Sequence, residues 1–197
     1  RNAVCGPVAS TPRGHAIYRA LLPFDRVPPD IEADCVTIWL YPGGHVVHYA
    51  VSNWRNFNIV AAIDAGAVET GWNTLTDGRD LHDAFADADD SLSNLVRTPA
   101  KWLKWQGADL SPLTAWSKGN IALVGDAAHA TLPYLAQGAV MSLEDACVLV
   151  RQLKDNAAPA AAFTQYAEIR RERCTRIQAE SRKLAKIYHA RGPVAFA

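Results

Sequence analysis

The first third of the chain alternates short hydrophobic runs with turn residues. The runs are rich in valine, isoleucine, tyrosine and tryptophan, a composition that favours β-strands. Four strands are predicted: HAIYRALL (15–22), CVTIWLY (35–41), HVVHYAVS (45–52) and FNIVAAI (57–63). The sequence YPGGH at 41–45 predicts a tight hairpin turn between the second and the third strand. We therefore expect a β-sheet in this region.

Helical spacing replaces this pattern in the rest of the chain. Segment 76–97 is polar with a few spaced apolar residues, which predicts two short amphipathic helices. Segment 101–116 predicts an extended, tryptophan-rich stretch that leads into the apolar run 121–125. Longer helices are predicted over about 138–153 and about 159–189. The first of them carries one apolar stripe, formed by Leu143, Cys147, Val150 and Leu153.

Composition restricts the classes of function. The 197 residues are 49% hydrophobic, which suits one compact domain or two small ones. Lysine plus arginine and aspartate plus glutamate number 20 each, and this zero balance argues against nucleic acid or an anionic membrane as a partner. The four cysteines are far apart without CxxC spacing, so a reducing cytoplasm is the simplest location. No hydrophobic run reaches membrane-spanning length.

The stretch NIALVGDAAHATLPYLAQGAVMSLEDA at 120–146 is the strongest candidate for chemistry. Its unbroken apolar run at 121–124 predicts a strand buried on both faces, the usual situation of a parallel strand. Ligands of open α/β sheets bind beyond the carboxyl ends of such strands, which is where Asp126 falls. A carboxylate there accepts hydrogen bonds, and the hydroxyl groups of a sugar or polyol are natural donors.

Small residues surround that carboxylate and would let a ligand approach the backbone closely. They are Gly125, Ala127 and Ala128. Pro133 stiffens the following loop, and a helix then opens with Gln137, Gly138 and Ala139. The unpaired N–H groups of that helix suit an acceptor that becomes anionic, as the N1–C2 carbonyl edge of a flavin does on reduction. We interpret the stretch as a cofactor site; helix capping by Asp126 with simple packing is the alternative.

The same residues resemble a known family, the FAD-dependent aromatic hydroxylases, which are single-component flavoprotein monooxygenases. LVGDAAHATLPYLAQGA followed by SLEDA is similar to that family's second FAD motif nearly throughout. YRALLP (18–23), YPGGHVVHYAV (41–51) and YAEIRRER (166–173) also look like blocks of its salicylate hydroxylase and 6-hydroxynicotinate 3-monooxygenase branch. The resemblance covers almost the whole chain. It implies an α/β fold with α+β character, like that of p-hydroxybenzoate hydroxylase.

The resemblance also implies an arrangement and a chemistry. Residues 1–107 would form the substrate-side sheet with short helices, 108–157 the returning segment of the FAD-binding domain, and 158–197 the C-terminal helix. Asp126 would bind the ribityl chain of FAD, Pro133 would lie beside the isoalloxazine ring, and residues 137–139 would face its pyrimidine side. NADH or NADPH would reduce the FAD. O2 would then form a flavin C4a-hydroperoxide that hydroxylates a small aromatic substrate, with an aromatic acid favoured.

Two motifs of the family are absent from the chain, the GxGxxG nucleotide fingerprint and the DG motif. RNAVCGP at 1–7 resembles the residues that close the DG motif. We therefore expect the second half of such an enzyme, with the N-terminal FAD-binding half as its partner; a homodimer is left open. Two other functions also stay open, an epoxidase or halogenase-like branch of the same fold and a truncated, non-catalytic module.

Tyr18, Tyr134 and His15 are the candidates for proton transfer with a phenolic substrate. The family places substrate-contacting side chains on the strand of Tyr18. Strand alternation puts Tyr18 on the face opposite His15 and Arg19, and only one face can line a pocket. Tyr18 is preferred over His15, with a buried structural tyrosine as the alternative. Tyr134 follows Pro133 in the proposed flavin loop.

No metal site is expected from the polar clusters of the sequence. His45 and His48 have HxxH spacing, but on a strand they would point to opposite faces. DADD at 87–90 lacks the loop of a calcium site and predicts a solvated surface. The cations between Arg170 and Lys186 alternate with glutamates at helix-pair spacings, which predicts an exposed, salt-bridged helix face.

Overall fold

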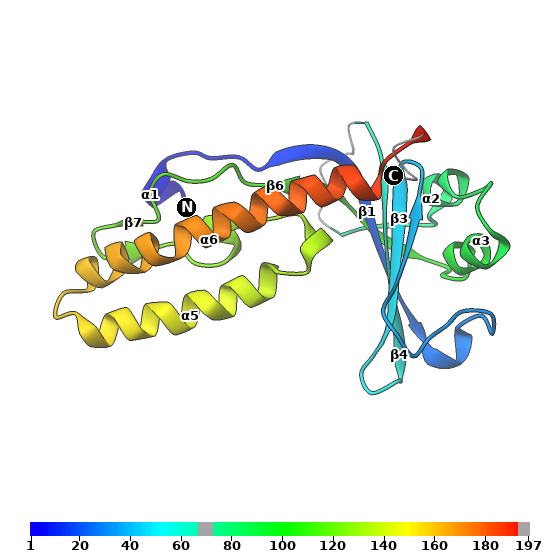
Figure 1. The fold of residues 1–197 in the computed structure, drawn as a ribbon, viewed down its shortest axis with the longest axis horizontal. Coiled ribbons are helices and arrows are strands. Elements are labelled where there is room, and N and C mark those ends of the chain that lie inside the picture. Colours follow the sequence, from blue (N-terminus) through cyan, green and yellow to red (C-terminus); the bar gives the residue numbers. More distant parts are fainter. Residues whose placement is uncertain (67–72, 193–197) are drawn as a thin grey trace. The chain divides into compact units, whose positions relative to one another are not determined.

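The computed structural model describes residues 1–66 and 73–192, which form two compact units (Figure 1). The helical unit consists of residues 1–12 and 108–185. The sheet unit consists of residues 13–107 together with the C-terminal segment from Lys186. Within the described ranges, no helix is both long enough and apolar enough to cross a membrane.

Six strands form the sheet, in the order β2-β3-β4-β1-β6-β5. Their bounds are Thr11–Pro23 (β1), Thr37–Tyr41 (β2), Gly44–Val51 (β3), Asn56–Asp64 (β4), Thr74–Thr76 (β5) and Trp102–Asp109 (β6), with the short 3-10 helix η1 at Phe24–Arg26. The pairs β1/β4, β2/β3, β3/β4 and β5/β6 are antiparallel. Only Pro42 and Gly43 connect β2 to β3, and Gly43 adopts a left-handed φ of +82° that glycine tolerates. The predicted strands and the hairpin are confirmed.

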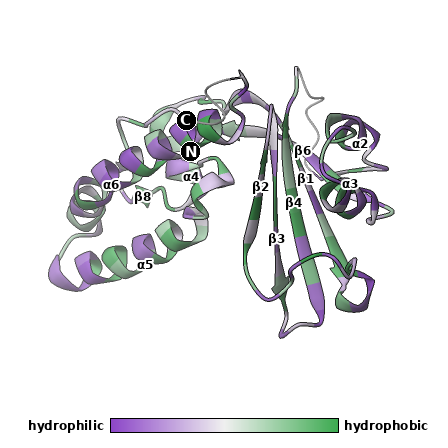
Figure 2. Ribbon diagram, turned by 45° about the vertical axis from the view of Figure 1, so that its right-hand side comes forward, coloured by the Kyte–Doolittle hydropathy of each residue, from purple (hydrophilic) through white to green (hydrophobic). Residues whose placement is uncertain are grey.

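One face of the sheet is covered by two short helices, α2 (Arg79–Ala84) and α3 (Asp90–Arg97) (Figure 2). The strand register sets Tyr18 opposite Ala61, and Ala61 opposite Val46, on that face. These residues share a hydrophobic core with side chains from the helices, including Leu81, Phe85, Leu92 and Leu95. Asp89 caps α3, because its carboxylate accepts the Ser91 amide at 2.9 Å.

Two long helices dominate the helical unit, α5 (Gly138–Asp155) and α6 (Pro159–Tyr188), and both predicted helices are confirmed. Hydrophobic positions recur along each of them (Figure 2). The shorter elements are α1 (Asn2–Cys5), β7 (Ser117–Lys118), β8 (Ile121–Ala122), α4 (Asp126–His129) and the 3-10 helix η2 (Pro133–Leu135). The core of this unit includes Trp116, Met141, Tyr166, Cys174 and Ile177.

The prediction of a doubly buried parallel strand at 121–124 is wrong. Only β8 forms there, and it pairs antiparallel with β7. Ile121 is 48% exposed and Val124 44% exposed, whereas Leu123 is buried. Among the described residues no parallel strand lies beside this run, so its side chains divide between a buried and an exposed side instead of being covered on both.

Burial along the two long helices follows their sequence patterns only in part. α5 buries Met141, Asp145 and Gln152. Five other apolar residues of the helix are exposed, and this surface, the exposed stripe of α5, consists of Val140, Leu143, Cys147, Val150 and Leu153. The prediction of an exposed charged face on α6 is wrong for Arg170, which is buried. Arg170 and Asp145 can both be buried because their opposite charges neutralise each other across the two helices, with Nε and Oδ1 2.8 Å apart.

Candidate functional site

A hollow of about 430 Å³ lies in the helical unit at the turn that follows β8. It is lined by Asp126, Thr131, Leu132, Pro133, Ala136, Gly138, Ala139 and Ser142. These residues come from α4, from the loop that contains η2, and from the first turn of α5. The hollow therefore coincides with the sequence stretch that predicts a cofactor site.

Gly125 makes the sharp turn from β8 into α4. Its φ is +57°, and a Cβ at this position would come within 2.9 Å of the Ser142 hydroxyl oxygen. The buried amide of Gly125 donates to Oδ2 of Asp145 at 2.9 Å, and its carbonyl accepts from the amides of Ala128 and His129. The left-handed conformation favours glycine here, and a larger residue would also have to displace the Ser142 hydroxyl.

Two polar groups of the hollow are placed to meet a ligand. Asp126 is exposed at the start of α4, where the partial positive charge of the helix favours a carboxylate. The Thr131 hydroxyl oxygen is buried, yet none of the described residues offers it a hydrogen bond. A buried hydroxyl without a partner is unfavourable, and a ligand hydroxyl or carbonyl would satisfy it. The residues present therefore fit a polyol-bearing cofactor such as FAD.

Side chains of α6 hold the loop of the hollow from behind. The amide nitrogen of Gln178 donates to the carbonyls of Leu110 at 2.9 Å and Ala130 at 3.0 Å. The hydroxyl of Ser181 donates to the carbonyl of Leu132 at 2.8 Å. Because Gln178 and Ser181 are buried, these bonds are protected from water and keep the loop in shape without a ligand.

A buried charged cluster lies beneath the turn. Asp145 is hydrogen-bonded to His129 Nε2 at 2.6 Å and to Arg170 Nε at 2.8 Å. Burial is the largest influence on His129 and disfavours its imidazolium, but the hydrogen bonds and charges of Asp145 and Cys174 together outweigh burial and raise the pKa of His129 to about 9. Burial likewise works against ionised Asp145, yet hydrogen bonds from His129 and Arg170 hold its pKa below the ordinary value. Both groups are therefore charged at neutral pH.

Most of the predicted cofactor residues meet at the hollow, which is lined by Asp126, Pro133, Gly138 and Ala139. Gly125 is buried behind the turn, and Gln137 precedes α5, where its carbonyl accepts the Met141 amide at 2.8 Å. Sequence reasoning missed Thr131 and Asp145. The sequence does contain one signal for Asp145: it lies one helical turn after Met141, an apolar residue that α5 buries.

Tyr18 lies in the core of the sheet unit, on the face covered by α2 and α3. Its ring meets Trp102 edge-on with centroids 6.3 Å apart, and its hydroxyl is 3.4 Å from Oδ2 of Asp80. The Lys104 ammonium lies 5.3 Å from the ring centroid. Burial raises the pKa of Tyr18, so the phenol is protonated at neutral pH. The alternation along β1 places His15 on the other face.

The opposite face of the sheet unit carries a histidine group that includes the candidate His15 and that sequence reasoning did not assemble. His189 follows α6 and is hydrogen-bonded through Nδ1 to Asp64 at 2.7 Å and through Nε2 to His45 Nδ1 at 2.9 Å. The His15 ring lies 4.5 Å from that of His189, and its Nε2 is 4.0 Å from Asp64. Burial and then the His189 charge lower the pKa of His15, and the same causes lower that of His45 to about 3. Both imidazoles are therefore neutral at pH 7.

His48 differs from His45 as the strand alternation predicts. It accepts a hydrogen bond from Trp39 Nε1 at 2.8 Å and stacks on Phe57, a residue of the core beneath α2 and α3. The two histidines of the HxxH spacing thus belong to different faces. The histidine group could not be read from the sequence, because its members come from four separate elements.

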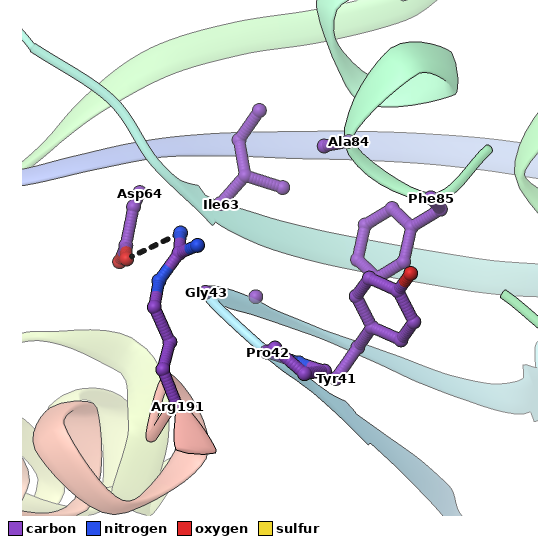
Figure 3. A pocket seen from close by; sticks show the side chains of 9 residues that line it. Tyr41, Pro42, Gly43, Ile63, Asp64, Ala84, Phe85 and Arg191 are labelled. Atoms are coloured by element: carbon purple, nitrogen blue, oxygen red, sulfur yellow. Dashed lines mark hydrogen bonds and ion pairs between the residues drawn. The ribbon is translucent and has the colours of Figure 1, made fainter. Parts of the chain in front are cut away.

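A second hollow, of about 320 Å³, lies at the β2–β3 hairpin of the sheet unit (Figure 3). The rings of Tyr41 and Phe85 line one side, with centroids 5.3 Å apart. On the other side Arg191 donates to Oδ2 of Asp64 at 3.2 Å and lies against Gly43, where a Cβ would collide with the guanidinium. Because Arg191 and Asp64 already pair with each other, a ligand in this hollow would mainly contact the rings of Tyr41 and Phe85.

Comparison with known proteins identifies the family. Residues 21–181 match the family described as the FAD binding domain, and the chain belongs to that family. It is 33% identical over 180 residues to 3-hydroxybenzoate 6-hydroxylase 2 of Aquipseudomonas alcaligenes, covering 91% of this chain and 56% of the relative. It is 34% identical over 173 residues to salicylate hydroxylase of Pseudomonas putida, covering 82% and 40%. The resemblance to FAD-dependent aromatic hydroxylases is confirmed, and the chain spans about half the length of the curated relatives it matches.

Solved structures agree with this assignment. A substrate complex of salicylate hydroxylase matches with a TM-score of 0.83 at 26% identity, covering 95% of this chain and 50% of that one. Klebsiella pneumoniae HpxO, complexed with FAD and uric acid, has the same TM-score of 0.83 at 24% identity, covering 96% and 49%, and so bears on the fold alone. The predicted fold class, a mixed α/β fold with an antiparallel sheet and C-terminal helices, is confirmed.

Proposed function

We propose that this chain is the C-terminal half of an FAD-dependent monooxygenase, the parent protein, which hydroxylates a small aromatic acid. The observation that carries the proposal is the hollow at the turn after β8, with the exposed carboxylate of Asp126 and the unsatisfied hydroxyl of Thr131. Relatives named as hydroxylases of 3-hydroxybenzoate, at 33% and 34% identity, support an aromatic acid as the substrate class.

Five residues of the hollow then have definite roles. When bound, FAD supplies the redox chemistry, with NADH or NADPH as reductant and O2 as co-substrate. Asp126 accepts hydrogen bonds from ribityl hydroxyls, and Thr131 satisfies its buried hydroxyl on the same ligand. Pro133 presents a rigid apolar surface to the ring. The N–H groups at the start of α5, from Gly138 and Ala139, face the edge of the ring that gains negative charge.

The protein must also move the proton of a phenolic substrate, because the ring is more nucleophilic as a phenolate. His15 is a neutral imidazole at pH 7 and is thus in the protonation state of a base, although burial makes it a weaker one, whereas the buried Tyr18 phenol with its raised pKa would first have to lose its own proton. Tyr134 is half-buried and follows Pro133 in the loop of the hollow. We therefore rank His15 and Tyr134 before Tyr18, reversing the order that the sequence favours.

Exposed apolar surface supports the proposal of a missing partner half. The exposed stripe of α5 and the side chains of Ile121 and Val124 are all in the helical unit. Monomeric soluble proteins seldom leave a contiguous apolar surface uncovered. An N-terminal FAD-binding half of the parent protein would cover this surface and complete the binding of the adenine end of the cofactor.

The decisive experiment is on the parent protein. We expect the purified protein to carry flavin absorbance and to oxidise NADH or NADPH faster when salicylate or 3-hydroxybenzoate is present. Mass spectrometry in 18O2 should find one labelled oxygen in the aromatic product. A folded protein without flavin would favour the non-catalytic module, and flavin with an epoxidised or halogenated product would favour the other branches of the fold.

A further inference from the structure

One carboxylate oxygen joins both ends of the turn that carries Asp126. Oδ2 of Asp145 accepts the buried amide of Gly125 at 2.9 Å and lies 2.6 Å from Nε2 of His129. Gly125 precedes α4 and His129 ends it, so this helix of 4 residues is held at its two ends by a single side chain. A helix that short does not hold its own shape in water. The exposed position of Asp126 between the two bonds therefore depends on Asp145.

The other oxygen of Asp145 is fixed to α6. Oδ1 accepts from Arg170 Nε at 2.8 Å, while the same guanidinium bonds Glu144 at 2.7 Å and the carbonyl of Met141 at 3.2 Å. Arg173 holds Glu144 in turn with bonds of 2.7 and 2.8 Å. The Asp145 carboxylate is thus held by hydrogen bonds both from the turn and from α6, which fix its orientation.

Stability alone is a poor explanation for such a cluster. Removing several charges from water costs free energy, and well-packed apolar residues at such positions are often equally stable. What the ionic cluster supplies is one defined arrangement, in which every bond of Asp145 has a fixed direction. The arrangement that it defines is the turn between β8 and α4, where Asp126 faces the hollow.

We propose that Asp145 is the positioning residue of the cofactor site: by holding Gly125 and His129 with one oxygen, it keeps the Asp126 carboxylate where the ribityl chain binds. The inference rests on the proposed function. Asp145 touches no atom of the cofactor in this role, and its effect passes through the backbone of the turn. Loss of its charge should therefore weaken FAD binding even though the lining of the hollow is unchanged.

If Asp145 positions the turn in this way, FAD affinity should depend on pH, because its partner His129 titrates. The charged or titratable groups around it are Asp145 and Glu144 on α5 and Tyr166, Arg170 and Cys174 on α6. With a pKa raised to about 9, the imidazolium is present at neutral pH and is lost as the pH rises through that value. The ion pair with Asp145 is then lost, and only a hydrogen bond from a neutral imidazole to the carboxylate remains, which holds the turn less strongly. FAD affinity should fall over the same pH range.

The test compares Asp145→Asn with the matched control Glu144→Gln in the parent protein. Glu144 is the adjacent carboxylate and is paired with the same Arg170, but its bonds run to arginines and not to the turn. We expect Asp145→Asn to raise the Kd of FAD by about ten- to a hundredfold, the range of a hydrogen bond to a charged group. Glutamine keeps an acceptor for Arg170, and the bonds of Arg170 to Asp145 and to the Met141 carbonyl remain, so Glu144→Gln should change the Kd by less than about twofold.

A second measurement, also in the parent protein, reports on the turn itself. Amide hydrogen exchange followed by NMR should show Gly125 protected, and Asp145→Asn should speed its exchange by about tenfold or more while Glu144→Gln does not. His129→Gln keeps a donor for Asp145 but does not titrate. It should therefore abolish the fall in FAD affinity between pH 7 and pH 10.

The outcomes separate this inference from the proposed function. Undiminished FAD affinity in folded Asp145→Asn protein, or equal effects of the two carboxylate variants, would overturn the inference. If Asp145→Asn does not fold, the pH profile decides, and a profile that His129→Gln leaves unchanged overturns it. A wild-type parent protein that binds no FAD would instead remove the proposed function, while the exchange of Gly125 would still test the turn.

Discussion

His189 and Asp64 lie 125 positions apart in the sequence and are joined by a hydrogen bond of 2.7 Å between Nδ1 and Oδ1. The other ring nitrogen of His189 bonds Nδ1 of His45 at 2.9 Å. The C-terminal segment is thereby attached to β4 and β3 within the sheet unit. Because His45 is buried, losing the hydrogen bond from its Nδ1 to His189 should cost stability, and that cost should appear in the free energy of unfolding.

We accordingly expect His189→Ala to lower the free energy of unfolding by about 1–3 kcal/mol, the cost of removing one partner from a buried hydrogen bond. Urea denaturation followed by circular dichroism measures the change. Lys186→Ala is the control, since Lys186 is an exposed residue of the same segment and its loss should matter by less than about 0.5 kcal/mol. Equal midpoints for the two variants would mean that the histidine group does not hold the segment.

The pKa of His129 predicts how stability depends on pH. Its value in the folded protein, about 9, lies above the ordinary 6.5, so folding favours the protonated form. The stabilisation is fully present below pH 6.5 and is lost as the pH rises through about 9. The shift is equivalent to a loss on the order of 3 kcal/mol. His129→Gln should remove this part of the pH dependence. Urea denaturation of both proteins at pH 6, 7.5 and 9 measures the free energy of unfolding. If the two proteins lose the same free energy between pH 6 and pH 9, the prediction is wrong.

The fold could be read from the sequence where the pattern depends on local spacing. The strands β1 to β4, the Pro42–Gly43 turn and the two long helices follow from alternation, turn residues and helical periodicity. The pattern of apolar and polar residues does not show which face of a helix is buried when two oppositely charged side chains can be buried together as a pair. Arg170 and Asp145 look like surface residues in the sequence, yet each is buried because the other is present.

The candidate site was predictable to a similar degree. The residues that line the hollow lie in one continuous stretch, so Asp126 and Pro133 could be found from the motif. The histidine group could not, because His15, His45 and His189 meet only through strand register and the placement of the C-terminal segment. The error at 121–124 has a related cause, since burial on both faces needs neighbouring strands that the described residues do not supply.

The carboxylate of Asp126 should contribute directly to cofactor retention. In the parent protein, Asp126→Ala should weaken FAD binding by about 1.5–3 kcal/mol, as expected for a hydrogen bond to a charged group. Asp155→Ala is the control, because Asp155 is an exposed carboxylate at the other end of α5. Flavin content after gel filtration and the Kd of FAD provide the measurement. Full occupancy in a folded Asp126→Ala protein would remove the assignment.

The exposed stripe of α5 should make the isolated chain associate, either with itself or with an added N-terminal half. We expect the double variant Leu143→Ser, Val150→Ser to lower the sedimentation coefficient and the binding of a hydrophobic dye, because both side chains are exposed. Ile169→Ser on α6 is the control, since Ile169 is also an exposed aliphatic residue of the helical unit. A wild-type chain that stays monomeric at high concentration and binds FAD tightly alone would contradict the prediction.

The rate of hydroxylation in the parent protein should show which of His15, Tyr134 and Tyr18 transfers the proton of the substrate. Replacing the group responsible should lower the hydroxylation rate by roughly ten- to ten-thousand-fold, the range of general acid–base catalysis. Flavin reduction should suffer less, because hydride transfer does not need that proton. Stopped-flow measurements on His15→Asn, Tyr134→Phe and Tyr18→Phe would follow the two steps separately.

We expect the large loss in His15→Asn or Tyr134→Phe, because the Tyr18 phenol is buried against Trp102 and its pKa is raised. A selective loss in Tyr18→Phe would restore the order favoured by the sequence, and parental rates in all three would place the proton acceptor on another residue.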